Sequence, residues 1–495
     1  MRAWSARRRA AALTVVAALF LTGCGTTVTG RAGESALGQG DLSQASGVAT
    51  GANVSGGTAL GGDGSVAGDQ ATPGLGGAET GSLPVSGQAL AGAAGATSLP
   101  PVTVGLEYVN AGDGAAAAGA IGVKGISAGD DAGSFRILFD EINRKGGLAG
   151  RKVKTVFASY DPTGSDPATQ EQAICDTFTQ DNKVEVALLV ATASEGLRSC
   201  LAKKGVATIS AGLGAMVDEK TFRASPLFAT SGTLSLDRMA AVYVDGLWAQ
   251  GYFGSNPTIG LVTAEEGPFT RTADGAFRQA LRRHGLTVAK EQRVPSAYTV
   301  GGYGGAAPSV QSAVLTFRAA NVTHVMFLQP IGAAALLFML SADSQQYRPR
   351  YGMSTNDQLQ NVAMQVPTSQ LEGALAVGWS PAADVPTSTF PLSAAAKACL
   401  ALLARHGDHP GEQSAVAGTL MICDQVAVLA AASTQSVGGL RTISGIERLG
   451  SSVASAAYLG LSYGAGRRDG ISLVAGAAYA VPCSCFRYSS LRLRP

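Results

Sequence analysis

The chain has 495 residues, enough for two folded domains of ordinary size and further terminal segments. Its 37 Lys and Arg residues nearly balance 35 Asp and Glu residues, giving a formal net charge of +2. Apart from the arginines within the first nine residues, no dense cluster of basic residues occurs, so the sequence does not show the electrostatic footprint of a nucleic-acid-binding protein.

The first 23 residues are typical of a signal peptide, with a basic start "MRAWSARRR" and a short apolar run "AAALTVVAALF". The run is shorter than the ~20 residues that a spanning helix needs, although an N-terminal anchor helix is the alternative. "LTGC" resembles the lipobox of bacterial lipoproteins, which implies cleavage before Cys24 and lipid on its thiol and new amino group. More than one acyl chain would make this anchor stable. Losing the four arginines of this segment lowers Lys plus Arg from 37 to 33 against 35 acidic residues, a net charge near −2.

Residues 24–101 begin with the candidate lipidated Cys24 and continue as Gly, Ala, Ser and Thr with almost no large apolar side chains. Such a segment cannot bury enough surface to offset the entropy cost of ordering it. We therefore expect a disordered tether. A glycine-rich fibrous or β-helical module is the alternative, but it would need a fixed repeat, and we find none.

From residue 102 onward, apolar β-type runs alternate with segments whose apolar residues recur at helical spacing. This alternation predicts an α/β protein with parallel sheets and helices on both faces, and two such series predict two domains. The expected strands are 102–109, 152–161, 184–191, 206–211, 227–232, 258–266, 288–294, 323–330, 348–355, 372–381 and a terminal strand region at 471–488. The expected helices are 134–147, 167–182, 194–205, 234–251, 270–285, 309–321, 333–346, 413–434 and 443–453.

The segment "EINRKGGLAGRKVKTVFASYD" at 141–161 resembles the signature of type I periplasmic binding proteins, the leucine/isoleucine/valine-binding group that serves ABC importers. In that family the segment is a helix, its Gly-Gly stop, a Gly-Arg turn and a strand. The order of elements from Val102 to Tyr488 fits the same family. The ending "CSCFRY" is similar to endings of a lipoprotein branch of it.

The resemblance implies two Rossmann-like lobes joined by a hinge of three crossovers, with ligand bound between the lobes. Lobe 1 is expected at 102–232 plus 382–452, and lobe 2 at 233–381 plus 453–495. The rule that open α/β sheets bind ligands beyond the carboxyl ends of their strands points independently to the same place.

Six further cysteines follow Cys24, and an even count in an exported chain suggests disulfides. Metal ligation is the weaker alternative, because no C-x2-C pair occurs and the four histidines are scattered. In the family fold the cysteine-bearing helices are neighbours in lobe 1, which implies the pairs Cys175–Cys200 and Cys399–Cys423. Cys483 and Cys485 either pair in a strained small ring or remain free thiols.

The stretch "GISAG" at 125–129 matches the G-x-S-x-G pattern of a hydrolase nucleophile elbow, with Ser127 as the candidate nucleophile. An elbow needs a strand directly before the serine, but the expected strand ends near Val109 and residues 110–125 look like a loop. No histidine stands in a suitable loop, and 65 glycines make chance matches common. We interpret the match as accidental, although Ser127 follows the first strand and can line the mouth of the cleft.

A second glycine-rich stretch, "GGYGG" at 301–305, lacks the Lys-Ser/Thr of a phosphate-binding loop and its strand–helix context. We expect a flexible loop here, with Tyr303 within reach of the cleft.

Two loops of lobe 1 are candidates for ligand binding. In the family, the loop after the third strand and the loop after the fourth strand grip the ligand's carboxylate through backbone and hydroxyl groups. Here they are "ATASEG" and "SAGLG". Simple capping of the next helix by the serine of the first loop is the alternative. The residues implied are Thr192, Ala193, Ser194, Ser210, Ala211 and Gly212.

In lobe 2, "EEGPF" places Phe269 where the family often has an aromatic residue over the ligand, with ordinary packing as the alternative. Amino-acid binders of the family also place an acidic residue after the middle strand of this lobe, where this chain has Gln329. A buried ammonium without a counter-charge is costly. Either Glu265, Glu266 or Glu107 substitutes, or the ligand is an amide, a urea-like compound or a carboxylic acid, with Gln329 bonding to an amide or carbonyl.

These features together predict an exported, lipid-anchored solute-binding protein on the outer face of the cell membrane. We expect a monomer with no catalysis, cofactor or metal, which closes on a small molecule and then docks on an ABC permease. The alternatives are a ligand-sensing subunit of a signalling system, a cell-envelope hydrolase using Ser127, and a purely structural lipoprotein.

Overall fold

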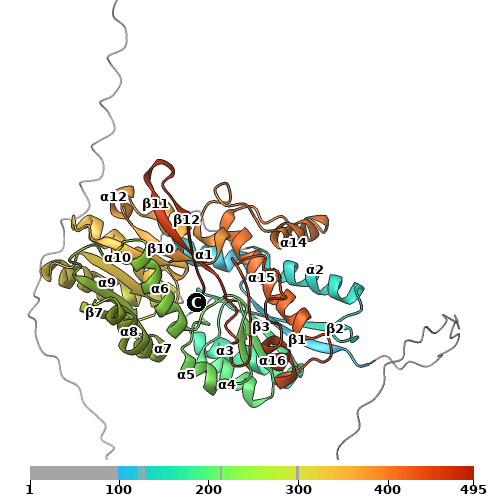
Figure 1. Cartoon of the computed structure of the whole chain (residues 1–495). Coiled ribbons are helices and arrows are strands. Elements are labelled where there is room, and N and C mark those ends of the chain that lie inside the picture. The colour runs from blue at the N-terminus through green and yellow to red at the C-terminus, as the bar shows by residue number, and fades with distance from the viewer. Residues whose placement is uncertain (1–98, 121–122, 124–128, 165, 212–214, 297–299) are drawn as a thin grey trace, which may run out of the picture. The chain divides into compact units, whose positions relative to one another are not determined.

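The computed structural model describes residues 99–495, apart from 121–122, 124–128, 165, 212–214 and 297–299. Two sheets flanked by helices organise this part of the chain into two lobes (Figure 1). The predictions for the signal peptide and the tether, including Cys24, lie outside the described residues.

Lobe 1 is built on a parallel sheet in the order β2-β1-β3-β4-β5. Its central strand β3 is apolar on both faces, as expected for a strand covered by helices on each side. In β3, Val186 and Leu188 face the core cluster shared with α2, α15 and α16, whereas Ala187 and Leu189 face the cluster shared with α3 and α4. The strands are Val102–Tyr108 (β1), Val153–Ser159 (β2), Val186–Leu189 (β3), Ala207–Ser210 (β4) and Phe228–Thr230 (β5). The helices are Asp131–Arg144 (α2), Pro167–Asp176 (α3, continued by a π-helical turn at Thr177–Asp181), Glu195–Lys203 (α4), Glu219–Ala224 (α5), Ala394–Arg405 (α14), Gln413–Ala432 (α15) and Gly439–Glu447 (α16).

Lobe 2 is built on a sheet in the order β12-β11-β10-β9-β8-β6-β7. Within β8, Met326 and Leu328 face the cluster that includes α6 to α8, and Val325 and Phe327 face the cluster that includes α9 to α11. The last two strands form an antiparallel hairpin that pairs with the edge of β10, whereas the other strands are parallel. The strands are Ile259–Ala264 (β6), Val288–Val294 (β7), His324–Leu328 (β8), Arg350–Ser354 (β9), Leu375–Gly378 (β10), Val474–Ala480 (β11) and Cys485–Leu493 (β12). The helices are Leu236–Ala249 (α6), Gly267–Thr272 (α7), Arg278–Arg283 (α8), Val300–Ala319 (α9), Ala333–Ser344 (α10), Leu359–Gln365 (α11), Thr368–Leu371 (α12) and Pro381–Asp384 (α13).

Three chain segments cross between the lobes, after β5, after β10 and after α16. They lie against one another: Leu459 N donates to Trp379 O at 2.9 Å, and a Cβ on Gly232 would come within 1.7 Å of the Tyr458 hydroxyl. Only glycine fits at residue 232, so the first and third crossovers approach more closely than any side chain allows.

Helix α15 is, within the described residues, the one helix long and apolar enough to cross a membrane by length and composition. It is 67% buried over its apolar window and packs against α2 and α16. This is the environment of a core helix.

The expectation of a loop at 110–125 is wrong, because residues Ala111–Ala120 form helix α1. Four consecutive alanines at 115–118 carry the strongest helix propensity and outweigh the flanking glycines. The Asn110 carbonyl accepts from Gly114 N at 3.0 Å, which starts the helix. Ala118 and Val123 pack against the core of lobe 2, so the segment after β1 reaches the second lobe.

The expectation of a flexible loop at "GGYGG" is also wrong, since residues 301–305 lie in the first turns of α9. The buried residues Val310, Val314 and Phe317 anchor this helix on the sheet, and the glycines extend it at its N-terminal end. Tyr303 is half-buried, and this burial raises the pKa of its phenol.

Candidate functional site

The first candidate loop of lobe 1 follows β3 and contains Thr192, Ala193 and Ser194. The Thr192 hydroxyl donates to Glu171 Oε1 at 2.5 Å, and the Ser194 hydroxyl donates to Glu171 Oε2. Ser194 Oγ also accepts from Leu197 N at 3.1 Å and so caps α4. The two hydroxyls that the sequence assigns to a ligand therefore hold a carboxylate of the protein itself, which comes from α3.

The other residues assigned to lobe 1 are buried. Ala193 and Ser210 are 0% exposed, and Ala211 is 1% exposed. The Ala211 N–H donates to Leu189 O at 2.9 Å, which ties the second loop to the end of β3. Gly212 lies outside the described residues. The structure thus brings the two loops together, with the Ala211 N–H already paired inside the lobe.

A buried carboxylate lies beneath the first loop. Glu107, near the end of β1, is 0% exposed, and its Oε2 accepts from Val190 N at 2.7 Å and Ala191 N at 2.9 Å. Its Oε1 has no hydrogen-bond partner among the described residues. Burial raises the pKa of Glu107 from 4.5 to about 8, against the opposing effect of the two N–H donors. The sequence offered Glu107 as a counter-charge for an ammonium, but in this environment it is largely protonated at neutral pH.

The candidates on lobe 2 differ in exposure. Glu265, directly after β6, is exposed, and its N–H donates to Val294 O at 3.0 Å. Phe269 is 0% exposed and lies in the same core cluster as Phe277. In this arrangement packing inside lobe 2 accounts for Phe269, and Glu265 is the candidate whose side chain reaches solvent.

Gln329 is held within lobe 2 at both ends of its amide. Its Nε2 donates to Asp357 Oδ1 at 2.7 Å, and its Oε1 accepts from Ala334 N at 2.8 Å at the start of α10. Asp357 also accepts from Ser354 N at 2.7 Å and is 0% exposed. Burial raises the pKa of Asp357 to about 7, with the hydrogen bonds from Gln329 and Ser354 opposing the rise. A carboxylate therefore lies beside Gln329, although it comes from the 3-10 turn Thr355–Asp357 that follows β9.

Asp384 is a second buried carboxylate of lobe 2 that the sequence did not single out. Its Oδ2 accepts from Thr355 Oγ1 at 2.7 Å, Ser380 N at 3.0 Å and Tyr488 Oη at 2.6 Å. Its Oδ1 has no partner within the described part of the chain. Burial raises its pKa to about 6, against the opposing hydrogen bonds from Tyr488 and Thr355. Asp384 thereby connects β9, the second crossover and β12.

A local sequence pattern marks the position of Asp357, but none marks that of Asp384. Ser354 and Asp357 form a capping box, whose S-x-x-D spacing is visible in the sequence. The Asp384–Tyr488 bond joins residues 104 positions apart, so no local pattern marks it.

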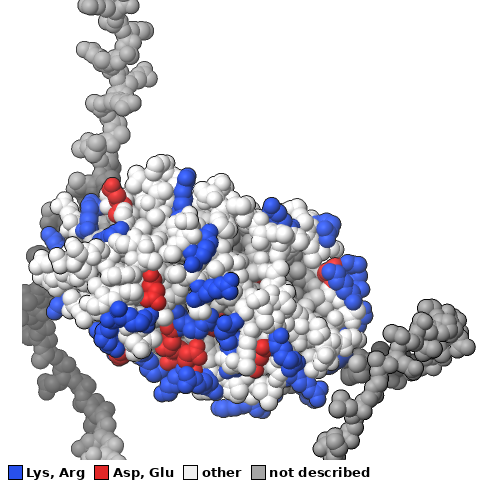
Figure 2. Space-filling model, in the orientation of Figure 1, with Lys and Arg blue, Asp and Glu red and all other residues white. Residues whose placement is uncertain are grey.

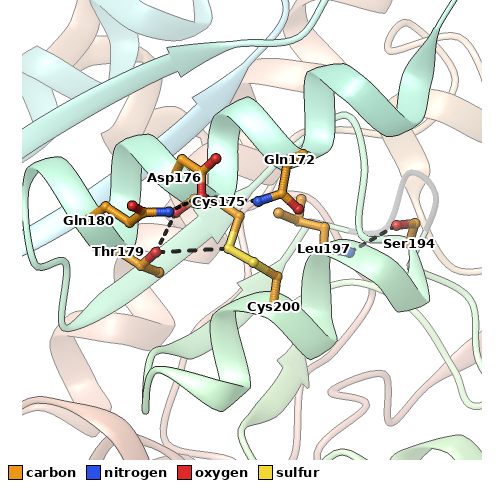
Figure 3. Close-up of a disulfide and its surroundings, with 8 residues drawn as sticks. All are labelled: Gln172, Cys175, Asp176, Thr179, Gln180, Ser194, Leu197 and Cys200. Carbon is orange, nitrogen blue, oxygen red and sulfur yellow. Dashed lines mark hydrogen bonds between the residues drawn. A yellow bond between two sulfur atoms is a disulfide. The ribbon is translucent and has the colours of Figure 1, made fainter.

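Disulfides hold helix pairs in lobe 1 and the turn between the last two strands. The bonded pairs are Cys175–Cys200, Cys399–Cys423 and Cys483–Cys485. Figure 3 shows the first of these between α3 and α4, with Ser194 capping α4 at the edge of the same view. Cys175 follows Glu171 by one helical turn. The bond therefore fixes the two helices whose residues meet at the first loop.

An ion pair joins the lobes. Arg271 of α7 donates from Nε to Asp218 Oδ2 at 2.6 Å and from Nη2 to Asp218 Oδ1 at 3.0 Å, and Asp218 caps α5. Burial alone would raise the pKa of Asp218, but the hydrogen bonds from Arg271 and Thr221 lower it overall. Figure 2 shows acidic and basic side chains together in the area where Figure 1 labels α5 and α7, on a face that is otherwise mainly uncharged.

The hydrolase interpretation depends on Ser127, which lies outside the described residues. Two histidines have structural partners in lobe 2. His284 Nε2 lies 2.8 Å from Asp245 Oδ1, and His324 Nε2 lies 3.0 Å from Tyr252 O. Burial lowers the pKa of His324.

Solved structures share this two-lobed fold at low sequence identity. An ABC transporter substrate-binding protein from Desulfitobacterium hafniense, in complex with Leu, has 16% identity and a TM-score of 0.54 over 79% of this chain and 100% of its own. LivJ from Streptococcus pneumoniae, in complex with isoleucine, has 13% identity and a TM-score of 0.56 over 80% and 100%. A solute-binding protein from Rhodopseudomonas palustris, in complex with 3,4-dihydroxy benzoic acid, has 14% identity and a TM-score of 0.55 over 80% and 97%.

No curated protein matches the sequence. A family model described as periplasmic binding protein matches residues 101–436, which span both lobes and more than half of the chain. The two α/β sheets, the three crossovers and this match agree with the resemblance of residues 141–161. The chain belongs to the periplasmic binding protein family.

Proposed function

We propose that this protein is an extracytoplasmic solute-binding protein, anchored by lipid on Cys24, that captures a small molecule between its lobes and delivers it to an ABC permease. Ligand contacts with both lobes stabilise a closed form, and closure turns about the three crossovers. In this proposal residues 1–23 are the signal peptide, 24–101 the tether, 102–232 plus 382–452 lobe 1 and 233–381 plus 453–495 lobe 2. Helix α13 spans the boundary at 381/382, and its Asp384 bonds to residues of lobe 2. The protein binds and releases its ligand as a monomer, without catalysis.

One observation carries this proposal. The loops after β3, β4 and β6 follow the carboxyl ends of parallel strands in two separate sheets, and in the described part of the chain three crossovers join those sheets. Ligand sites of open α/β sheets lie at such ends. Proteins of the same fold are solved with leucine, isoleucine and a dihydroxybenzoic acid. Amino acids, amines, amides and aromatic acids are therefore the classes to test.

A thermal-unfolding screen of the purified protein tests ligand binding. A ligand at about a hundred times its dissociation constant adds ~2.7 kcal/mol to the free energy of unfolding. For a protein of this size the midpoint then rises by about 2–4 °C. A shift with one chemical class supports the proposal and names the class, whereas no shift across amino acids, amines, amides, ureas, acids and sugars contradicts it.

Cell fractionation tests the anchor separately. We expect the wild-type protein in the membrane fraction and the Cys24→Ala variant to lose incorporation of labelled fatty acid. A variant that keeps its label would contradict lipidation at Cys24 without touching the evidence for ligand binding.

A further inference from the structure

Two carboxylates of lobe 1 occupy the hydrogen-bond donors of the first loop. Glu171 accepts the hydroxyls of Thr192 and Ser194, and Glu107 accepts the N–H groups of Val190 and Ala191. A ligand carboxylate arriving at these hydroxyls would meet Glu171 at hydrogen-bond distance from the same groups. Two like charges so close are strongly unfavourable unless one is protonated.

Tyr160 lies close enough to both acids for their charges to affect its phenol. Its ring is 4% exposed at the end of β2, where its N–H donates to Tyr108 O at 2.8 Å. Burial, and after it the charges of Glu171 and Glu107, raises the pKa of the Tyr160 phenol to about 12. Of the two acids near the ends of β1, β2 and β3, Glu171 is the one whose side chain is partly exposed, whereas Glu107 is buried.

The basic residue closest in sequence to this loop is directed into the lobe. Arg198 of α4 is 6% exposed, donates to the Ala193 carbonyl and lies 4.9 Å from the ring centre of Phe228. Its guanidinium supports the loop from the protein side. The carboxylate of Glu171, in contrast, belongs to a partly exposed residue on the first turns of α3.

We propose that Glu171 makes this edge of lobe 1 a receptor for a cationic hydrogen-bond donor of the ligand, an ammonium or amidinium group, and not for a carboxylate. A carboxylate accepts about four hydrogen bonds, so Glu171 can keep its bonds to Thr192 and Ser194 and still accept from a ligand. Thr192 and Ser194 then orient the acceptor, and the disulfide between α3 and α4 keeps them in register with it. The inference rests on the proposed function and names its ligand class.

This assignment also explains why lobe 2 has Gln329 where a counter-charge for an ammonium was expected. The Gln329 amide is committed to Asp357 and Ala334, so it is not arranged for a ligand in this structure. Glu171 supplies the missing negative charge from the opposite lobe. Glu265, exposed after β6, adds a second acidic group on the lobe 2 side.

Probes that share an apolar part and differ in their charged group distinguish recognition of a cation from recognition of a carboxylate. Calorimetric titration would compare leucine with isopentylamine and isocaproate, phenylalanine with phenethylamine and hydrocinnamate, and benzamidine with benzoate. We expect binding of members that carry the cationic group and none of the acids that lack it. Because hydrogen bonds to a charged group contribute about 1.5–3 kcal/mol, Glu171→Gln should weaken the cationic ligands about tenfold to a hundredfold.

Three variants make the result specific. Glu195→Gln removes the same charge from an exposed residue at the start of α4 and should leave affinity unchanged. Glu171→Asp keeps the charge on a shorter side chain and should retain the preference for cations at reduced affinity. The unfolding midpoint of each variant without ligand shows whether that variant is folded. If Glu171→Gln does not fold, Glu171→Asp still tests the role of Glu171.

The outcomes distinguish this inference from the proposed function. Binding of the acids alone, or cation binding that Glu171→Gln leaves unchanged, would overturn the inference while solute binding stands. If neither these probes nor any compound class in the thermal screen binds, both the inference about Glu171 and the proposed solute-binding function are wrong. An equal loss in Glu195→Gln would show general attraction to an acidic surface and would also overturn the role given to Glu171.

Discussion

The two lobes hold the edges that we propose to face the ligand by different means. In lobe 1, carboxylates from β1 and α3 take up the donors of a loop, and a disulfide ties the helix that carries Glu171 to the helix that Ser194 caps. In lobe 2, the corresponding edge is a buried hydrogen-bond network around Asp357 and Asp384. In the described residues, the disulfide that belongs to lobe 2 only closes the turn between β11 and β12.

This difference between the lobes bears on which of the two edges would bind a charged group of the proposed ligand. The buried carboxylates of lobe 2 are paired with Gln329, Thr355 and Tyr488 inside the lobe, so they stabilise the edge itself. Lobe 1 instead combines a fully buried acid, Glu107, with a partly exposed one, Glu171. We infer that lobe 1 selects the ligand's charge and that lobe 2 supplies a rigid surface against which the ligand is closed.

The largest expected effect concerns the charge of Glu107. Its pKa is raised from 4.5 to about 8, so the folded protein binds more protons than the unfolded chain between these values. The contribution of this group to stability is therefore fully present at low pH and is lost as pH rises through that window, by about 1.4 kcal/mol per pH unit. Glu107→Gln cannot ionise, so urea unfolding should show wild-type stability falling relative to the variant as pH rises.

The other buried acids titrate in both proteins and cancel in this comparison. Glu141→Gln, which changes a solvent-accessible acid paired with Arg144 and Lys145, is a control that should show no such relative fall. A pH-independent difference between wild type and Glu107→Gln would mean that Glu107 is not neutral in the folded protein.

The next largest effect distinguishes the Cys175–Cys200 disulfide of lobe 1 from the Cys483–Cys485 disulfide of lobe 2. In the chain-entropy account, a bond that closes a loop of 25 residues stabilises by ~3.5 kcal/mol, and one across two residues by much less. Replacing Cys175 and Cys200 by serine should lower the free energy of unfolding by about 3 kcal/mol and weaken ligand binding, since α3 loses its tie to α4. Replacing Cys483 and Cys485 should leave binding unchanged. Equal effects of the two replacements on affinity would show that the first disulfide does not position the site.

The sequence predicted what local patterns determine. The alternation of strands and helices, and with it the α/β class, follows from periodicity and turn residues, whereas the two-lobed fold was implied by the family resemblance at 141–161; the structure and the family match confirm both. Glycine content misled twice, at α1 and at the start of α9. In both places neighbouring alanines or a well-anchored helix outweighed the cost of glycine, which is only about 1 kcal/mol per residue.

The candidate site was less predictable because its polar contacts join distant segments. The sequence located the loop containing Thr192 and Ser194 but could not show that Glu171, 21 and 23 residues away, occupies their hydroxyls. It showed that Gln329 brings no charge, but it could not show that the Asp357 carboxylate reaches Gln329 from the turn after β9. Such partners depend on how elements pack, and packing is not encoded in a local pattern.

A smaller effect is expected from the network of lobe 2. Asp384→Ala leaves the Ser380 N–H and the Thr355 and Tyr488 hydroxyls without their acceptor, and unfolding in urea should show a loss of about 2–3 kcal/mol. Tyr488→Phe removes one donor only and should cost about 1 kcal/mol. If lobe 2 is only a rigid surface, Tyr488→Phe should not change the preference between cationic and acidic probes. A reversed preference would assign charge selection to lobe 2.

The smallest effect concerns the ion pair between the lobes. Arg271 is 41% exposed on its side chain, so solvent screening limits the pair with Asp218 to about 1 kcal/mol or less. Arg271→Ala should lower the free energy of unfolding by that amount at low salt, and the difference from wild type should shrink at high salt. Arg283→Ala is the matched control, because Arg283 is similarly exposed at 45% but pairs with Asp245 inside lobe 2.

The two arginines differ in one respect that bears on ligand binding. The Arg271 pair holds the lobes against each other in the present arrangement, so its loss should also change ligand affinity, whereas loss of the Arg283 pair acts within one lobe. Asp218→Asn keeps an oxygen to cap α5, which allows a double-mutant cycle with Arg271→Ala to isolate the pair. If the cycle gives a coupling energy of zero for ligand binding, the contact between Arg271 and Asp218 does not affect the opening and closing of the lobes. Charge at the edge of lobe 1 would then be the selective element, and the ion pair a neutral surface contact.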